Sequence, residues 1–368
     1  MEFFKNIINW LSGPTVLFTL ATIGFILSLR YPKVWSKRNA VILFTVMTAF
    51  YALSMFDTDF FLIVAKPDNV PITIVLYLVA FLTWFAMHQA VENDKRIANG
   101  EPPIEKQEED KVWVWPDLVY TELLCMIVLS IALMAWSILL TAPLEQPANP
   151  ADSPNPSKAP WYFLGLQEML VYFDPWLAGV AFPTFIIVGL MAIPYIDTNP
   201  KGNGYFTYKE RRVEIGIFLY GFLVLWVLLV VSGTFLRGPN WNFFGPYEYW
   251  DPHRVEPLLN VNVSDFFWVK LLSQPLPTNP LKREFLGVFL TLFYIGVLPV
   301  LLSKPKEKLP GFLKWVSLNG YYEKMGPARY YLGVSLFLLM LSLPIKMYLR
   351  WAFNLKYVVA FPEIFFNI

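Results

Sequence analysis

Long apolar stretches alternate with short polar ones along nearly the whole chain of 368 residues. About 20 consecutive apolar residues are enough to cross a bilayer as an α-helix. Eight stretches fit this description, at 13–30, 39–56, 70–91, 117–141, 178–196, 213–236, 284–303 and 330–349. Two further apolar stretches, 162–173 and 258–275, are short or interrupted, so we expect helices lying in the membrane interface. The pattern predicts an all-α integral membrane protein with about eight transmembrane helices plus short interfacial helices.

Lysine and arginine residues favour one set of alternate loops. This set holds 18 of the 29 basic residues, in loops 30–38, 92–112, 197–212 and 303–329. Cytoplasmic loops of membrane proteins are enriched in these residues, so the set is predicted to face the cytoplasm. Both termini and the loops 142–177 and 237–283 then face the opposite, positive side, as an even number of spans requires.

Composition narrows the chemistry further. Hydrophobic residues make up 56% of the chain and charged residues only 15%, whereas soluble domains are about a quarter charged. The apolar composition predicts membrane lipids as the surroundings, and the net charge of +1 implies no nucleic-acid partner. The single cysteine, Cys125, cannot form an internal disulfide, and there is no CxxCH motif for covalent haem attachment.

The two histidines limit the redox roles open to the chain. A b-type haem inside a helical bundle commonly needs two axial histidines on facing helices. His88 is expected near the cytoplasmic end of one span and His253 in an outer loop, so the two cannot face each other across one haem. The sequence therefore predicts no haem and no metal bound by this chain alone.

Glu122 is expected about one turn inside the span 117–141, in the stretch "VYTELLCM". Ionisable groups at membrane depth are costly and often mark function. Two interpretations stay open: a carboxylate that reaches the headgroups from a helix end, and a member of a proton path.

The stretch "NPSKAPWYFLGLQEML", residues 155–170, joins two predicted spans. Its prolines restrict the backbone before a short helix that begins near Trp161. At 100° per residue, Trp161, Leu164 and Glu168 share one face of this helix. An aromatic wall with one carboxylate suits a quinol, since the ring gains apolar contact and its hydroxyl a proton acceptor. An interfacial aromatic belt explains the same residues, and the residues alone favour the belt.

Several segments, in order, resemble the cytochrome b family, which forms the core of bc1 and b6f quinol oxidoreductases. "APWYF" (159–163) is similar to the family's Pro-Glu-Trp-Tyr motif and the Phe that follows it. "WPDLVYTELL", "FPTFIIVGLMAIPYIDTNPKGN" and "RRVEIGIFLYGFLVLWVLLVVSGTFLRGP" resemble the helices around that loop. The resemblance covers about 112–240, equivalent to subunit IV of the b6f type. Pro160 stands where the family has its glutamate, and Glu168 is the hypothetical substitute.

The resemblance implies a haem-free subunit of a bacterial bc-type quinol:cytochrome c oxidoreductase, multi-pass in the cytoplasmic membrane, with both termini periplasmic. Its substrate would be quinol or menaquinol, oxidised in electron transfer coupled to proton translocation. A haem-binding cytochrome b chain, a Rieske-type iron–sulfur protein and a cytochrome c subunit would be the partners that carry haem b and the Fe–S cluster. The implied quinol contacts in this chain are Pro160, Trp161, Tyr162, Phe163 and Leu164. Glu168, surrounded by aromatic and aliphatic side chains, would accept a proton.

The domains expected are a three-helix extension at 1–91, a charged cytoplasmic linker at 92–111, the cytochrome b C-terminal-type domain at 112–240 and an outer aromatic loop with two further spans at 241–368. The loop 237–256 is predicted either to contact a partner or to cover its own helix ends. The alternative function is a non-catalytic membrane anchor or a transporter-like subunit of another respiratory complex.

Overall fold

The computed structural model describes residues 2–107, 111–140, 144, 147–151, 153–199 and 204–368. Short parts of the predicted loops 92–112, 142–177 and 197–212 lie outside these described residues. The described part of the chain is mostly helical and contains almost no strand, as predicted.

The elements follow one another in this order: α1 (Glu2–Leu11), α2 (Pro14–Arg30), η1 (Pro32–Trp35), α3 (Lys37–Ser54), α4 (Thr58–Val64), α5 (Asn69–Ala98), η2 (Ile104–Lys106), η3 (Val114–Leu118), α6 (Val119–Leu139), α7 (Trp161–Met169), η4 (Leu177–Ala181), α8 (Phe182–Ile196), α9 (Arg212–Leu219), η5 (Tyr220–Val227), α10 (Leu228–Val231), η6 (Ser232–Leu236), η7 (Pro239–Trp241), η8 (Asp265–Leu271), α11 (Pro280–Leu292), η9 (Phe293–Val297), α12 (Leu298–Leu302), η10 (Lys306–Lys308), η11 (Gly311–Val316), α13 (Asn319–Met325), α14 (Pro327–Phe353), β1 (Ala360–Phe361), η12 (Pro362–Ile364) and β2 (Phe366–Asn367).

Helices long and apolar enough to cross a membrane occur at six of the eight predicted spans, and a bent helix pair occurs at each of the other two. Within the described residues there are six, at Asn69–Ala98, Val114–Leu139, Leu177–Ile196, Arg212–Leu236, Pro280–Leu302 and Pro327–Phe353. Two bent pairs raise the number to as many as eight: α1 with α2, bent by 74°, and α3 with α4, bent by 114°. The chain is thus a multi-pass, all-α membrane protein.

Polar residues at the helix starts explain where several elements begin. The Ser36 side chain accepts a hydrogen bond from the Asn39 backbone at the start of α3. Asp57 caps α4 in the same way, accepting from the Phe60 backbone N–H at 2.9 Å. Asn279 caps α11. Such side chains satisfy backbone donors that have no partner inside the helix.

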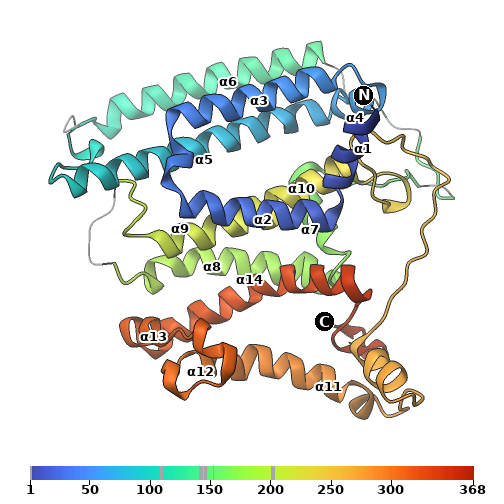
Figure 1. Cartoon of the computed structure of the whole chain (residues 1–368). Helices are drawn as coiled ribbons and strands as arrows, with labels where there is room; N and C mark the ends of the chain where they lie inside the picture. The colour runs from blue at the N-terminus through green and yellow to red at the C-terminus, as the bar shows by residue number, and fades with distance from the viewer. Residues whose placement is uncertain (1, 108–110, 141–143, 145–146, 152, 200–203) are drawn as a thin grey trace.

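The long helices lie side by side and run in roughly the same direction across the molecule (Figure 1). Both chain termini, α1, α4 and α7 lie at one end of this bundle, and α13 lies at the other end (Figure 1). An even number of crossings accounts for the two termini sharing one end. The loop that contains α7 therefore lies at the same end as both termini.

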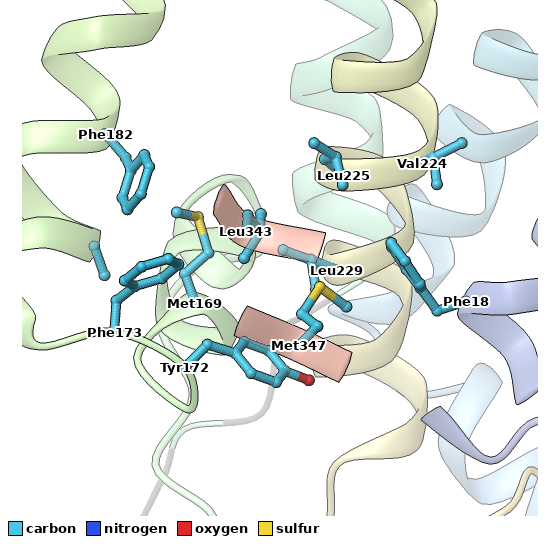
Figure 2. Packing of buried hydrophobic residues seen from close by; sticks show 11 residues of the cluster. Phe18, Met169, Tyr172, Phe173, Phe182, Val224, Leu225, Leu229, Leu343 and Met347 are labelled. Atoms are coloured by element: carbon cyan, nitrogen blue, oxygen red, sulfur yellow. The ribbon is translucent and has the colours of Figure 1, made fainter. Parts of the chain in front are cut away.

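A hydrophobic core forms where α7 and the turn after it meet three of the long spans. Figure 2 shows side chains from α2, from 169–182, from the span 212–236 and from α14 converging on this point. The cluster is Phe18, Met169, Tyr172, Phe173, Ala178, Phe182, Val224, Leu225, Leu229, Leu343 and Met347. Close packing of these side chains anchors the short helix α7 to the bundle, through van der Waals contact rather than a transfer from water, since lipid tails are as apolar as the side chains.

Of the two predicted interfacial segments, the first forms helix α7, as expected. In the second, 258–275, regular structure is confined to η8, because residues before it are extended and pair with the C-terminal segment. Val261 forms a bridge with Leu355, and the Val263 backbone donates to the Tyr357 carbonyl at 3.0 Å. Backbone pairing there takes the hydrogen bonds that a helix would otherwise use.

The loop 237–256 packs on its own chain. Phe244 is almost fully buried. The Tyr247 backbone donates to the Asn9 side chain at 3.0 Å, and the Tyr247 and Ser54 hydroxyls are hydrogen-bonded at 2.5 Å. The loop thus covers the ends of α1 and α3, which is the second of the two alternatives expected for it.

Candidate functional site

The segment before α7 is folded back onto the helix by one side chain. Gln167 accepts a hydrogen bond from the Ala159 backbone N–H at 2.7 Å and donates to the Ser157 carbonyl at 2.8 Å. Pro160 lies directly before the first helical residue, Trp161, and has an extended backbone. The amide of Gln167 therefore fixes the direction in which the chain enters α7, and with it the position of the first aromatic residues.

Helix α7 presents two chemically different faces. Trp161, Tyr162 and Phe163 are 40%, 49% and 53% exposed, and the Tyr162 and Phe163 rings lie 4.7 Å apart. Leu164 and Glu168 are only 2% exposed. The predicted site residues are thus divided, with the aromatic side chains outside and Leu164 and Glu168 inside. We call Trp161, Tyr162 and Phe163 the aromatic face.

A close helix contact explains why α7 is seated in this way. A Cβ atom placed on Gly233 would lie 2.8 Å from Cγ of Leu164, which is closer than carbon atoms can pack. Gly165 on α7 in turn lies against Trp226 and Val230 of the same long span. Glycine at these positions lets α7 approach the span 212–236 closely, so that the buried face of α7 is held against it.

Glu168 forms an ion pair with Arg237. Three contacts between the guanidinium nitrogens and the carboxylate oxygens measure 2.6, 3.1 and 3.2 Å. Arg237 also donates to the Trp241 carbonyl at 2.9 Å. The expectation that Glu168 has only aromatic and aliphatic neighbours is wrong, because the chain beyond the span 212–236 brings Arg237 to it.

Charge and burial act in opposite directions on Arg237. Its burial disfavours the charged form, and the neighbouring Glu168 carboxylate outweighs that effect, so the pKa of Arg237 is raised above its ordinary value. The bidentate geometry is the strong form of an arginine–carboxylate pair. The pair therefore cross-links α7 to the end of the span 212–236.

A small cavity lies beside this ion pair. Its volume is about 10 Å³, and Glu168, Tyr172, Ser232 and Arg237 supply polar groups to its wall. A space of this size accommodates about one water molecule, whereas ligand sites of drug size measure about 300–1,000 Å³. A quinol ring does not fit beside Glu168 in this arrangement, and the surface open to a ring at α7 is the aromatic face.

Lys158, three residues before Trp161, was not selected from the sequence as a site residue. Its ammonium group donates to the Thr234 carbonyl at 2.9 Å and lies 4.7 Å from the centre of the Trp250 ring. Burial lowers the pKa of Lys158 to about 7, and Lys66 and Arg237 act in the same direction against the opposing effect of Glu168. The signal in the sequence was its place as the one cation in "NPSKAPWYFLGLQEML".

Glu122 and His88 belong to helices α6 and α5, outside this arrangement, whereas His253 follows Trp250 by three residues in the loop 237–256. Glu122 is exposed on α6, a helix whose apolar window has no buried side chain. His88 donates through Nδ1 to the Trp35 carbonyl at 2.9 Å and stacks on Trp84. His253 is exposed in the loop 237–256. Within the described part of the chain, no group of three or more His, Cys, Asp or Glu side chains could hold a metal ion.

Comparison with known families finds one match. Residues 147–245 match the model of the family described as Cytochrome b(C-terminal)/b6/petD. This range contains α7, Lys158, the ion pair and the whole span 212–236. It begins later than the predicted domain 112–240 and excludes α6. No solved structure matches the chain.

Proposed function

We propose that this chain, in which residues 147–245 form a cytochrome b C-terminal-type domain, is a haem-free subunit of a bacterial bc-type quinol oxidoreductase and supplies one wall of its quinol-oxidation pocket. The single observation that carries the proposal is the aromatic face, three consecutive exposed rings on a rigidly anchored helix inside the matched range. Quinol oxidation would be coupled to electron transfer and proton translocation.

The aromatic face offers what a quinol ring needs from a protein wall. Trp161, Tyr162 and Phe163 present three apolar rings whose neighbouring planes are inclined at 86° and 58°, and offset or edge contacts between aromatic rings contribute about 0.5–1.5 kcal/mol each. Pro160 and the buried Leu164 hold the two ends of this face in place. A partner chain would close the pocket from the other side, since ligand sites bury most of the ligand surface.

We propose the following placement for the whole chain. Loop 142–177 and both termini face the periplasm, and the linker 92–111 faces the cytoplasm, in accord with the distribution of basic residues. The extensions 1–91 and 241–368 flank the domain 112–240. A haem-binding cytochrome b chain, a Rieske-type iron–sulfur protein and a cytochrome c subunit would supply haem b and the Fe–S cluster, with quinol or menaquinol as substrate.

Proton acceptance by Glu168 remains a prediction, and the burial and pairing of this side chain limit how it could occur. The carboxylate is 2% exposed and paired with Arg237. To accept a proton, the carboxylate must give up part of its contact with Arg237. The proton would reach it through the small cavity at its side. Glu122, on the uncovered helix α6, remains a second candidate for a proton path.

The proposal is tested by purifying the complex from native membranes through a tag on this chain. A quinol-reducible b-haem spectrum should accompany the chain and be lost when the chain is isolated alone. Trp161→Ala should lower quinol turnover per haem about tenfold or more, as the loss of about 1.4 kcal/mol would do. Trp315→Ala, at a 90% exposed tryptophan in η11, is the matched control and should leave turnover unchanged.

Two outcomes would contradict the proposal. If no b haem co-purifies, the chain belongs to another kind of complex, and the alternative function as a membrane anchor is favoured. If haem is present but Trp161→Ala and Trp315→Ala behave alike, the aromatic face does not contact the substrate.

A further inference from the structure

Residues 354–368, which follow α14, fold into a small hairpin that we call the hairpin segment. Its strands β1 and β2 pair antiparallel, with Ala360 opposite Asn367. Val359 and Ala360 are only 2% and 6% exposed, so the segment is packed into the molecule rather than lying on its surface. It lies well beyond the range 147–245 that matches the cytochrome b family.

Helix α11 holds the hairpin segment from one side. The Glu284 carboxylate, 1% exposed, accepts a hydrogen bond from the Ala360 backbone N–H at 3.1 Å. Gly287 lies so close to the segment that a Cβ atom placed on it would be 1.9 Å from the Val358 carbonyl oxygen. A buried carboxylate that loses a hydrogen-bond donor carries a large desolvation penalty, so the segment is firmly attached to α11.

The same hairpin segment binds the turn that follows α7. Trp176 donates through Nε1 to the Asn367 carbonyl at 2.9 Å, and its ring stacks on Phe366 with the centroids 5.3 Å apart and the planes inclined at 25°. The Asn367 side-chain nitrogen donates to the Asp174 carboxylate at 3.0 Å. The two hydrogen bonds join residues 191 and 193 positions apart, so they connect the matched domain directly to the far end of the chain.

Lys356 joins the end of α7 to α14 through the start of the hairpin segment. Its ammonium group donates to the Leu170 carbonyl at 3.0 Å, and its own carbonyl accepts from the Lys346 ammonium group of α14 at 2.6 Å. Leu170 is the residue at which α7 ends. Lys346 is 4% exposed, and hydrogen bonds from charged donors are about twice as strong as neutral ones. The hairpin segment therefore lies between α7 on one side and α11 and α14 on the other, bound to all three.

We propose that the hairpin segment is a positioning element, which fixes the direction of α7 relative to α11 and α14 and so holds the aromatic face toward the quinol. Only its consequence in catalysis rests on the proposed function. Helix α7 has nine residues, and at about 1.5 Å per residue a tilt of about 10° at its held end would move the aromatic end by roughly 2 Å. A misplacement of about 1 Å can cost about 100-fold in rate. This assigns a role to the last two spans, which lie outside the matched range.

Hydrogen exchange of the peptide 161–176, in the full chain in native membranes, tests whether the hairpin segment holds α7. Phe366→Ala removes the ring that stacks on Trp176, and protection of the peptide should fall several-fold. Phe366→Tyr keeps a stacked ring and should restore protection. Phe365→Ala is the matched control, because this neighbouring ring is 88% exposed, and it should behave as the wild type. Equal protection in Phe366→Ala and Phe365→Ala would overturn the proposal.

A change on α11 tests whether position is transmitted through the hairpin segment. The nearest atoms to a Cβ on Gly287 belong to Val358 and Val359, so Gly287→Ala displaces the segment from the side away from Trp176. Protection of the peptide 161–176 should fall in this variant, and adding Phe366→Ala should lower it little further, since both changes act on one connection. Gly296→Ala, with no atom within 4 Å, should have no effect. Loss of protection confined to α11 and the hairpin segment would overturn the proposal.

Quinol turnover separates this inference from the proposed function. If both hold, Phe366→Ala should lower kcat/KM for quinol per haem about tenfold, as a misplacement of less than about 1 Å would do, and Phe366→Tyr should restore it. If exchange of the peptide 161–176 responds and turnover does not, the positioning role stands and the proposed quinol contact fails. If exchange does not respond, the positioning role fails whatever the turnover shows.

Discussion

Replacing Arg237 by methionine should destabilise the chain strongly, because it leaves the Glu168 carboxylate buried and without its cation. The carboxylate is 2% exposed and the Arg237 side chain 11% exposed, and three nitrogen–oxygen contacts of 2.6–3.2 Å join them. Removing one partner of such a buried pair costs about 3–5 kcal/mol. At about 2 °C per kcal/mol, the lower end for large domains, the unfolding midpoint should fall by roughly 6–10 °C.

The double variant Arg237→Met with Glu168→Met should recover most of this loss, since replacing both members of a buried pair by apolar residues is often nearly neutral. Arg254→Met is the matched control: Arg254 is paired with Glu256 at 2.5 Å, but the two side chains are 40% and 52% exposed, and exposed pairs contribute about 0–1 kcal/mol. Thermal unfolding of the detergent-solubilised full chain gives all three values. Equal midpoints for Arg237→Met and Arg254→Met, or a double variant as unstable as the sum of the single ones, would refute the reasoning.

Three further predictions concern other parts of the chain. Gly287→Ala should lower the unfolding midpoint by an amount equivalent to about 1–3 kcal/mol, because the new Cβ would lie 1.9 Å from the Val358 carbonyl oxygen; Gly296→Ala, with no atom within 4 Å, should have little effect, and equal shifts would contradict the contact. A cysteine at Gln107, in a chain without its native cysteine, should resist an impermeant reagent in sealed cells and react in inverted vesicles, and the opposite result would reverse the topology. Burial lowers the pKa of Lys158 to about 7, so above that pH the unfolded state binds more protons than the folded state. The free energy of unfolding should therefore rise with pH. Lys158→Met should lack this rise when its unfolding is measured beside that of the wild type.

The spans were predictable because their signal is local. A run of apolar residues predicts a helix without reference to the rest of the chain. The helices at 177–196, 212–236, 280–302 and 327–353 begin and end within a few residues of the predicted ranges. The sharp bends after α1 and α3 were not predicted, since the direction of a chain after a short polar break depends on packing with distant residues.

At α7, helical spacing predicts which residues share a face, but it does not predict their partners from distant parts of the chain. The helix from Trp161 onward and the burial of Leu164 and Glu168 on one face agree with the helical spacing read from the sequence. Trp161 was assigned to that same face, but it lies at the first helical residue and is 40% exposed. The partner of Glu168 lies 69 positions further along the chain, and no helical periodicity connects it with Arg237.

Lys158 was overlooked for a related reason. In the sequence it is one polar residue in a loop, and a loop lysine is ordinarily solvated. Its lowered pKa and its contacts arise only in the fold, where the end of the span 212–236 brings Thr234 to it and the loop 237–256 brings Trp250. Charge balance at a site such as this one depends on long-range contacts, which a single sequence does not reveal.

Photochemical cross-linking with an azido-quinone in native membranes tests the central claim most directly. The account predicts that the label in this chain lies on the peptide 158–170, at the aromatic face of Trp161, Tyr162 and Phe163, and that excess unlabelled quinone removes it. Label found instead along α6 or on α13, with the peptide 158–170 unmodified, would show that this chain does not form a wall of the quinol pocket at α7.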